Sequence, residues 1–323
     1  MGPLIDVVLL GILVLIAVAA IRLRDLFAVV MLFGIYSLMT AVLFMDLDAV
    51  DVAFTEAAVG AGVTTVLMLS ALRLTGRMER PSAHSALLPL VVVGVTGAAL
   101  VYGTLDAPLV GDPTAPAQHH IAPRYLAQGP IEVALPNVVT AVLASYRGYD
   151  TLGETVVIFT AGIAVILLLG LHDDARQPAT DSPELGRLVL RVVVKTLLPL
   201  ILLYALYVQF HGDFGAGGGF QAGVIFATGF ILYDLVFGDA IARRVMPPRW
   251  LPRLAALGVL LYAGVGVLGM LGGGAFLDYS VLSADPHHGQ HLGVMLVELG
   301  VGLTVFSIVL AIFYALTECR RTA

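Results

Sequence analysis

Nine apolar windows, each about 20 residues long, constrain the fold of this chain more than any other feature of its sequence. A helix of about 20 mostly apolar residues is long enough to cross the hydrocarbon core of a bilayer. The windows are residues 4–21, 26–45, 52–72, 87–103, 155–171, 188–210, 219–237, 251–271 and 291–316. The sequence therefore predicts an all-α polytopic membrane protein with about nine transmembrane helices.

The composition excludes a water-soluble domain. Only 12% of the residues are charged, whereas soluble domains have roughly 25%. The first window begins Met-Gly-Pro-Leu-Ile-Asp and lacks the cationic start and cleavage site of a signal peptide, so we expect a true span. The single cysteine, Cys319, excludes a disulfide framework or a thiolate metal cage.

Arginines and aspartates separate onto opposite sides when successive loops are assigned to alternate faces of the membrane. One face has Arg22, Arg24, Arg73, Arg77, Arg80, Arg176, Arg187, Arg191, Arg243, Arg244, Arg249, Arg253, Arg320 and Arg321. The other has Asp46, Asp48, Asp51, Asp106, Asp112, Asp150, Asp213, Asp278 and Asp285, with Arg124 and Arg147. The positive-inside rule then predicts that the N-terminus is outside and the C-terminus is cytoplasmic.

Loop lengths and composition predict four segments. Residues 1–103 form a four-helix unit, and residues 104–171 combine a long outer connection, a short helix and the fifth span. Residues 172–186 form a cytoplasmic linker, and residues 187–323 a second four-helix unit. The short helix, at residues 136–146, should lie along the membrane interface or pack laterally, because it is too short to span. Its predicted apolar face consists of Val138, Val139, Val142, Leu143 and Tyr146.

Ionisable residues inside spans are the first candidates for function, because each costs roughly 2.5–3.5 kcal/mol at the helix centre. Lys195 lies four residues before Pro199, which leaves the Lys195 carbonyl without its helical partner. Alternatively, Lys195 extends its ammonium group to the cytoplasmic surface. Glu298 lies about two turns from the outer end of the ninth span, where it either handles protons or cations or belongs to a structural pair.

Further acidic residues lie near span ends. Glu56 is a candidate for function, whereas Asp51, five residues earlier, is expected at the interface. Asp150 and Glu154 share a helix face; Asp150 suits capping and dipole compensation, and Glu154 is the better candidate for chemistry. Asp234 is expected to be a solvated boundary residue.

Histidines and glycines on the outer side predict no metal site and no nucleotide site. The histidine spacing defines no metal site for His119, His120, His287, His288 and His291. The cluster Gly217-Gly218-Gly219 joins two spans with no strand before it, which argues against a phosphate-binding loop. Gly219 and Gly223 have the spacing of small residues at close helix contacts.

Three stretches resemble, in order, small membrane subunits of Mrp-type sodium/proton antiporters and of membrane-bound hydrogenases. Asp51-Val-Ala-Phe-Thr-Glu-Ala-Ala-Val-Gly-Ala-Gly62 is similar to the D-type hydrogenase subunit, which is equivalent to the C-terminal part of the A-type antiporter subunit. Pro136-Asn-Val-Val-Thr-Ala-Val-Leu-Ala-Ser-Tyr-Arg-Gly-Tyr-Asp-Thr-Leu-Gly-Glu154 is similar to the adjoining E-type segment. The B-type antiporter subunit is matched by Leu198-Pro-Leu-Ile-Leu-Leu-Tyr204, His211-Gly-Asp-Phe-Gly-Ala-Gly-Gly-Gly-Phe-Gln-Ala-Gly223 and Gln290-His-Leu-Gly-Val-Met-Leu-Val-Glu-Leu-Gly-Val-Gly302.

Two departures from the antiporter pattern accompany this resemblance. Val59-Gly-Ala replaces the Val-Glu-Thr of many A-type subunits, which is nearer to the hydrogenase type and removes a carboxylate, and Ala216 replaces the usual proline before the glycines. The matched motifs add secondary site candidates to Asp150 and Asp51, namely His211, Asp213 and His291. They also define a loop and packing motif of Pro199, Gly217, Gly218, Gly219, Phe220 and Gly223.

The resemblance implies an accessory subunit of a multisubunit Na+/H+ antiporter in a bacterial or archaeal cell membrane. The alternatives are a membrane-arm subunit of a redox-driven pump related to group 4 hydrogenases and complex I, and a scaffold without ion traffic. Partners would be other antiporter-type subunits, the lipid bilayer, Na+ and H+, with no nucleic acid. No flavin, iron–sulfur, nickel or nucleotide motif is present, so we expect no cofactor and no enzymatic reaction. Lys195, Glu298, Glu154 and Glu56 are the predicted ion path.

The predicted topology can be tested by cysteine labelling. The C-terminus and residues 238–250 should be cytoplasmic and residues 106–130 outside, because the arginines are one-sided. The Ala115→Cys variant, made in a Cys319→Ser background, should react with an impermeant reagent added outside. Labelling from the cytoplasmic side alone would reject this topology.

Overall fold

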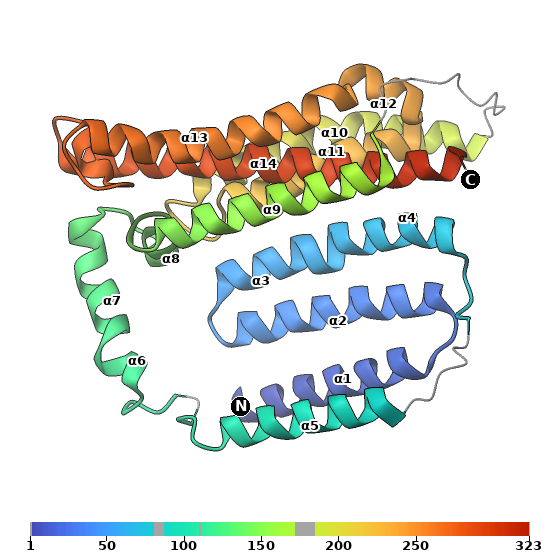
Figure 1. Cartoon of the computed structure of the whole chain (residues 1–323), viewed down its shortest axis with the longest axis horizontal. Helices are drawn as coiled ribbons and strands as arrows, with labels where there is room; N and C mark the ends of the chain where they lie inside the picture. The colour runs from blue at the N-terminus through green and yellow to red at the C-terminus, as the bar shows by residue number, and fades with distance from the viewer. Residues whose placement is uncertain (1, 81–86, 110, 172–184, 323) are drawn as a thin grey trace.

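The computed structural model describes residues 2–80, 87–109, 111–171 and 185–322, and these ranges are helical without strands (Figure 1). The N-terminal half contains α1 (Gly2–Arg22), α2 (Leu26–Asp46), α3 (Val50–Glu56), η1 (Ala57–Thr64), α4 (Thr65–Thr75), α5 (Leu87–Thr104), α6 (Pro116–His119), α7 (Ile121–Glu132), α8 (Val138–Thr140), η2 (Ala141–Tyr146) and α9 (Gly148–Leu169). The C-terminal half contains α10 (Leu185–His211), α11 (Gly219–Phe237), α12 (Asp239–Val245), η3 (Pro248–Trp250), α13 (Leu251–Leu271), η4 (Tyr279–Leu282) and α14 (Pro286–Thr322).

Within the described ranges, 9 helices have the length and apolar composition to cross a membrane. They are Leu4–Arg22, Leu26–Asp46, Val50–Thr75, Leu87–Thr104, Gly148–Leu169, Leu188–His211, Gly219–Phe237, Pro248–Leu271 and Pro286–Glu318. The prediction of a multi-pass membrane protein with nine spans is confirmed. The fifth span begins at Gly148, about two turns before the apolar window, because its first turns contain polar residues that no hydropathy window includes.

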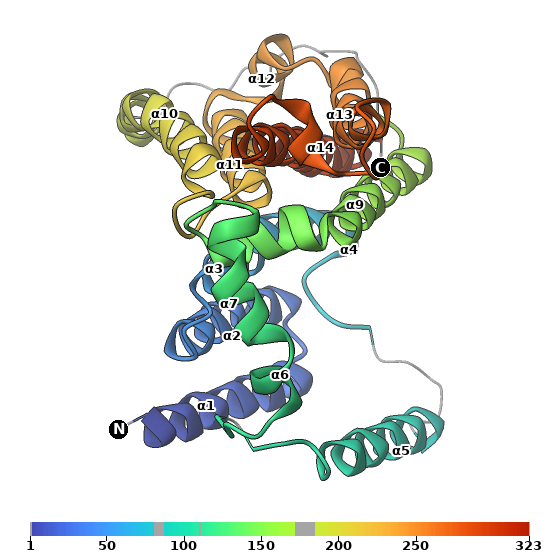
Figure 2. The ribbon, with the colours of Figure 1, turned by 90° about the vertical axis from the view of Figure 1, so that its left-hand side faces the viewer.

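Helix α14 is the centre of the C-terminal half. In α14, 67% of the residues in the apolar window are buried, whereas in α5 the corresponding share is 0%. α14 packs against α13, α11 and α9, and α4 brings the N-terminal helices to it. Figure 2 shows α1 and α2 layered below this bundle and α5 set apart, joined to the rest through α6 and α7. The core that positions the site is therefore built around α14.

Glycines allow the helices around α14 to approach at backbone distance. A Cβ atom at Gly223 of α11 would lie 2.6 Å from the Gly302 carbonyl oxygen, and one at Gly219 would clash with the Glu298 carbonyl. On α13, a Cβ atom at Gly258 would lie 2.5 Å from the Gly300 carbonyl oxygen. Within a bilayer, apolar helices gain little free energy by exchanging contact with lipid for contact with each other. Close packing is therefore a main source of their association.

The connection before α9 differs from the sequence-based expectation in two respects. α6 and α7 make part of it helical, and the short helix at residues 138–146 continues from α8 into the π-helical turn η2. The predicted apolar face is only partly buried, with Leu143 47% exposed. Instead the small residues Ala141 and Ala144 are buried, because the Tyr279 hydroxyl approaches closely and donates a hydrogen bond to the Ala144 carbonyl at 2.9 Å.

The Gly258 contact gives a stability prediction. Gly258→Ala should lower the stability of the full chain in detergent by roughly 1–3 kcal/mol, the usual cost of overpacking. Gly264→Ala, on the same helix with no atom within 4 Å of its added Cβ, should be neutral or stabilising, since alanine favours a helix over glycine. Thermal unfolding followed by circular dichroism checks both, and equal unfolding temperatures for the two variants would contradict close α13–α14 contact.

Candidate functional site

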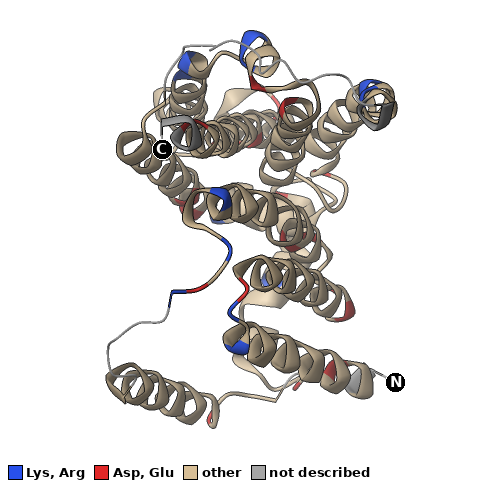
Figure 3. Cartoon of the chain, turned by 90° about the vertical axis from the view of Figure 1, so that its right-hand side faces the viewer, with Lys and Arg blue, Asp and Glu red and all other residues tan. Residues whose placement is uncertain are grey.

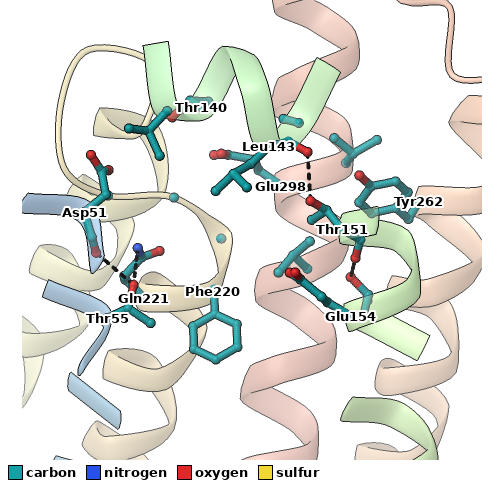
Figure 4. Close-up of a pocket in the computed structure, with 18 of the residues that line it drawn as sticks. Asp51, Thr55, Thr140, Leu143, Thr151, Glu154, Phe220, Gln221, Tyr262 and Glu298 are labelled. Carbon is teal, nitrogen blue, oxygen red and sulfur yellow. Dashed lines mark hydrogen bonds between the residues drawn. The ribbon is translucent and has the colours of Figure 1, made fainter. Parts of the chain in front are cut away.

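A cavity of about 360 Å³ lies where α3, η2, α9, α11 and α14 meet (Figure 4). Its polar lining consists of Asp51, Thr55, Thr140, Thr151, Glu154, Thr155, Gln221, Tyr262 and Glu298. Asp51 comes from the first predicted segment, Glu154 from the second and Glu298 from the last. The cavity is therefore shared by the three parts of the chain that carry sequence motifs.

Glu298 projects into this cavity from the first third of α14, the most buried of the membrane-spanning helices. Its carboxylate lies against a glycine-containing loop, residues 212–218: a Cβ atom on Gly212 would be 3.1 Å from Oε2, and one on Gly218 would be 3.1 Å from Oε1. Side chains at these two positions would crowd the carboxylate. The glycines thus make space for it between α10 and α11.

The charged groups that act on Glu298 are acidic. Asp51 and Asp213 are near enough to repel its charge. Within the described part of the chain, Glu298 has no hydrogen bond or ion pair. A carboxylate in this setting favours a bound proton or cation.

Asp51 and Thr55 on α3 connect the cavity to α11 and to the short helix. The Gln221 amide donates to the Thr55 hydroxyl at 2.8 Å, and that hydroxyl donates to the Asp51 carbonyl at 2.9 Å (Figure 4). The Asn137 amide donates to the Asp51 carboxylate at 3.4 Å and to the carbonyls of Gly212 at 3.1 Å and Gly215 at 2.9 Å. These bonds fix α3 beside the glycine-containing loop.

Glu154 lines the opposite wall, on α9. The Thr151 hydroxyl one turn earlier donates to the Leu143 carbonyl at 2.7 Å, which joins α9 to η2. Asp150 lies in the first turn of α9, exposed and paired with Arg147 at 2.6 Å, outside the cavity lining. Of the two acids that share a face at the start of this helix, only Glu154 contributes to the cavity.

An ion pair lies beside the cavity at the start of α14. His291 Nδ1 is 2.9 Å from Asp213 Oδ2, and the Asp213 side chain is 10% exposed. Burial raises the pKa of Asp213 above its ordinary value, and the charge of His291 opposes that rise. His211 stacks on Tyr207, with ring centroids 4.9 Å apart. Asp213, and through it His291, therefore lies close to the acidic cavity, and His211 contacts a different neighbour.

Two residues of the predicted ion path lie outside the cavity lining. Glu56 is directed toward α2: a Cβ atom on Gly60 would be 2.5 Å from both the Glu56 Oε1 and the Ser37 hydroxyl. Lys195 is exposed on α10, one turn before Pro199. The structure thus groups Glu298 and Glu154 with Asp51, which was expected at the interface and was a secondary site candidate.

The expectation for Asp234 was wrong. It is buried at the end of α11, only 7% exposed, because α12 folds over that end and buries Arg243. Arg243 pairs with Asp239 at 2.7 Å and with Glu318 at 3.5 Å. Loops that follow a span do not always leave its end in solvent.

The neutral polar residues of the cavity were not identified by the search for charges. Gln221 and Thr151 are visible in the sequence as polar side chains in or near apolar windows, which is the signal that could have found them. Carboxylate, hydroxyl and amide oxygens are ligands for hard cations. No group of three or more His, Cys, Asp and Glu residues within the described ranges forms a metal cluster.

Three family models match successive parts of the chain. Residues 11–77 match the MbhD family, the D-type MBH subunits, and residues 85–186 match the MbhE family, the E-type MBH subunits. Residues 189–311 match the domain related to the MnhB subunit of Na+/H+ antiporters. The matches follow the order of the three motif-bearing stretches. The cavity is thus lined by residues from all three matched regions.

Relatives extend this likeness over most of the chain. An A/B-type K+/H+ antiporter subunit from Rhizobium meliloti is 27% identical over 84% of this chain and 29% of its own length. An uncharacterised protein from Methanocaldococcus jannaschii is 31% identical over 44% of this chain and 60% of its own length. The chain thus spans less than two thirds of either relative. A mnhB2-type antiporter subunit from Staphylococcus haemolyticus is 33% identical over 40% of this chain and 93% of its own length.

Two solved structures are similar. The Mrp complex from Dietzia sp. DQ12-45-1b contains a chain that superposes with a TM-score of 0.75 at 28% identity, covering 96% of this chain and 34% of that one. A chain of an archaeal membrane-bound sulfane sulfur reductase superposes with a TM-score of 0.51 at 28% identity, covering 69% of this chain and 95% of that one. The chain belongs to the family of MnhB-type antiporter subunits, with MBH D-type and E-type regions preceding the MnhB-related domain in the same polypeptide.

Proposed function

We propose that the chain is an accessory membrane subunit of a multisubunit antiporter that exchanges Na+ for protons, and that the cavity is part of the ion path. The supporting observation is the placement of Glu298, Asp51 and Glu154 around one cavity, each from a different family-matched region. Relatives named as antiporter subunits support the same class of function. Other antiporter-type subunits would be its partners, and we assign it no catalytic reaction.

The physical basis of the proposal is uncompensated negative charge. Each ionised carboxylate within a membrane protein is costly unless a proton, a cation or a basic group offsets it. Asp51 and Asp213 add to the negative potential at Glu298. A cation or proton that enters the cavity would relieve that repulsion, and its departure would restore it. Alternating occupancy by Na+ and H+ is the exchange that an antiporter needs.

The proposed topology places the N-terminus outside and the C-terminus in the cytoplasm, which puts the cavity in the outer half of the membrane. The proposed units are residues 1–103, residues 104–171, the linker 172–186 and residues 187–323. Glu56 and Lys195 lie outside the cavity lining, and their part in an ion path stays a prediction. They would join one only through surfaces that face neighbouring subunits.

A second function is supported by the likeness to the sulfane sulfur reductase structure and by the MBH family models. In that case the chain would be a membrane-arm subunit of a redox-driven pump, with the redox chemistry in partner subunits. The cavity would have the same role in ion transfer. The subunits that copurify with the native chain distinguish the two assemblies.

The ion path predicts the effect of neutralising the cavity acids. Glu298→Gln and Glu154→Gln should each lower Na+-dependent proton flux in proteoliposomes about tenfold, the effect of losing roughly 1.4 kcal/mol of cation binding. Assembly should persist, because the amide keeps the shape of the acid. Dye-monitored proton flux after native purification measures both.

Asp106→Asn is the matched control, because it also removes one negative charge, but from an exposed residue outside the cavity lining. It should transport normally. If Glu298→Gln and Glu154→Gln both kept assembly and full flux, the ion path would lie elsewhere and the scaffold alternative would be favoured.

The Asp213–His291 pair gives a pH prediction. The pKa of Asp213 lies above 3.8 because burial disfavours its charge, while His291 lowers it. His291→Ala should therefore raise the Asp213 pKa further. Because the Asp213 pKa is higher in the folded state than in the unfolded state, the folded state binds the Asp213 proton more tightly. Protonation of Asp213 therefore stabilises the fold fully below the unfolded-state pKa, and this stabilisation is lost as the pH rises through the folded-state pKa.

Infrared difference spectroscopy of the Asp213 carboxyl band, identified by its loss in Asp213→Asn, would follow this titration. The midpoint should move to higher pH in His291→Ala. It should stay in place in His288→Ala, because His288 is exposed and does not act on Asp213. A midpoint unchanged by His291→Ala would contradict electrostatic coupling of the pair.

A further inference from the structure

An apolar groove of about 180 Å³ lies between α10, α11 and the end of α12, and it shares no lining residue with the acidic cavity. It is lined by Leu198, Leu202, Gly229, Phe230, Tyr233 and Val245. Gly229 forms the floor, where an added Cβ atom would be 3.0 Å from Leu202 Cδ2 and 3.5 Å from Leu198 Cδ1. A bulkier residue at this position would fill part of the groove.

Two cationic side chains lie on the groove side of α10. Arg191, Lys195, Leu198 and Leu202 recur at spacings of four and three residues, so they share one helix face. α10 and α11 are packed against each other, and Tyr233 lies one turn beyond Gly229 on α11. Because Leu198 and Leu202 contact Gly229, the two basic residues extend from the groove toward the end where α11 turns into α12.

Figure 3 shows Lys and Arg spread over this whole end of the molecule, on the N-terminal helices as well as on the C-terminal bundle. Lys195 is exposed and Arg191 is half-buried. Arg191 Nε is enclosed and has no hydrogen-bond partner among the described residues. Asp239 on α12 and Glu318 on α14 are bound by Arg243, at 2.7 Å and 3.5 Å. A buried donor of this kind favours an acceptor other than the described side chains.

We propose that this groove binds one anionic phospholipid, with its phosphate on Arg191 and Lys195 and an acyl chain along Leu198, Leu202 and Phe230. Guanidinium groups bind phosphate oxygens through paired, charge-assisted hydrogen bonds. Basic pockets between membrane helices bind anionic headgroups, and the apolar lining of this groove matches a hydrocarbon chain. The site is independent of the proposed ion path, and it gives Lys195 a role at the lipid interface.

The native complex, purified in detergent and depleted of lipid, tests the proposal. Adding phosphatidylglycerol should raise the thermal unfolding temperature of the wild-type complex, as a ligand specific for the folded state does. Phosphatidylcholine with the same acyl chains should have less effect. In the double variant Arg191→Gln/Lys195→Gln, the phosphatidylglycerol concentration for half the effect should rise about tenfold or more.

Two further variants separate lipid binding from general effects. Val245→Trp should weaken the response without removing a charge, because Val245 is 56% exposed and lines the groove. Arg22→Gln/Arg24→Gln removes the same charge at exposed sites on α1 and its loop and should respond like the wild type.

Native mass spectrometry should find one retained anionic phospholipid in the wild type and a reduced amount in the double variant. Equal retention in the two would overturn the proposal, as would equal responses to both lipids or an equal response to inorganic phosphate alone. Cross-linking of the Val245→Cys variant to a neighbouring protein within the groove would also overturn it, because a protein side chain would then be the occupant.

Discussion

Close glycine contacts between α14 and its neighbours are the constraint on which the rest of the structure depends. In a bilayer, moving apolar side chains from lipid into a helix contact gains little free energy, so helices associate through close packing and hydrogen bonds. Gly219 and Gly223 bring the α11 backbone to α14, and Gly258 does the same for α13. Because Gly219 contacts α14 at Glu298 itself, helix packing also determines where the glycine-containing loop of residues 212–218 meets that carboxylate.

The acidic residues at the two ends of the bundle differ in whether they have a basic partner. Near the end of α11, Asp239 and Glu318 are bound by the chain's own Arg243, and Asp234 is buried with them. This arrangement resembles a structural network, since breaking one member would leave a buried charge uncompensated. At the cavity, Glu298 has acidic neighbours and no basic partner among the described residues. In the proposed function a mobile proton or cation supplies that compensation, which is why the cavity, and not the Arg243 network, is the candidate for transport.

The fold was predictable from the sequence because hydropathy reports directly on spans, and all nine windows correspond to helices. The site was predictable only in part. Glu298 and Glu154 were found by their cost in an apolar window, but the choice between Glu56 and Asp51 depends on helix rotation. The π-helical turn η1, which follows Glu56, changes the residues per turn in a way that no apolar pattern reveals. Burial of Asp234 could not be predicted, because it depends on how α12 folds back after the span has ended.

Fusion of three family regions in one polypeptide has a consequence for the cavity. Several bonds cross the borders between these regions: Gln221 to Thr55 at 2.8 Å, Asn137 to the Gly212 carbonyl at 3.1 Å, and Tyr279 to the Ala144 carbonyl at 2.9 Å. If these three regions were separate polypeptides, the same contacts would have to form between different chains. A covalent link replaces that association with an intramolecular one at high effective concentration. The cavity therefore keeps its geometry through these hydrogen bonds, the glycine contacts and a buried apolar cluster to which all three regions contribute, with Val63, Ala144 and Val301 among its members.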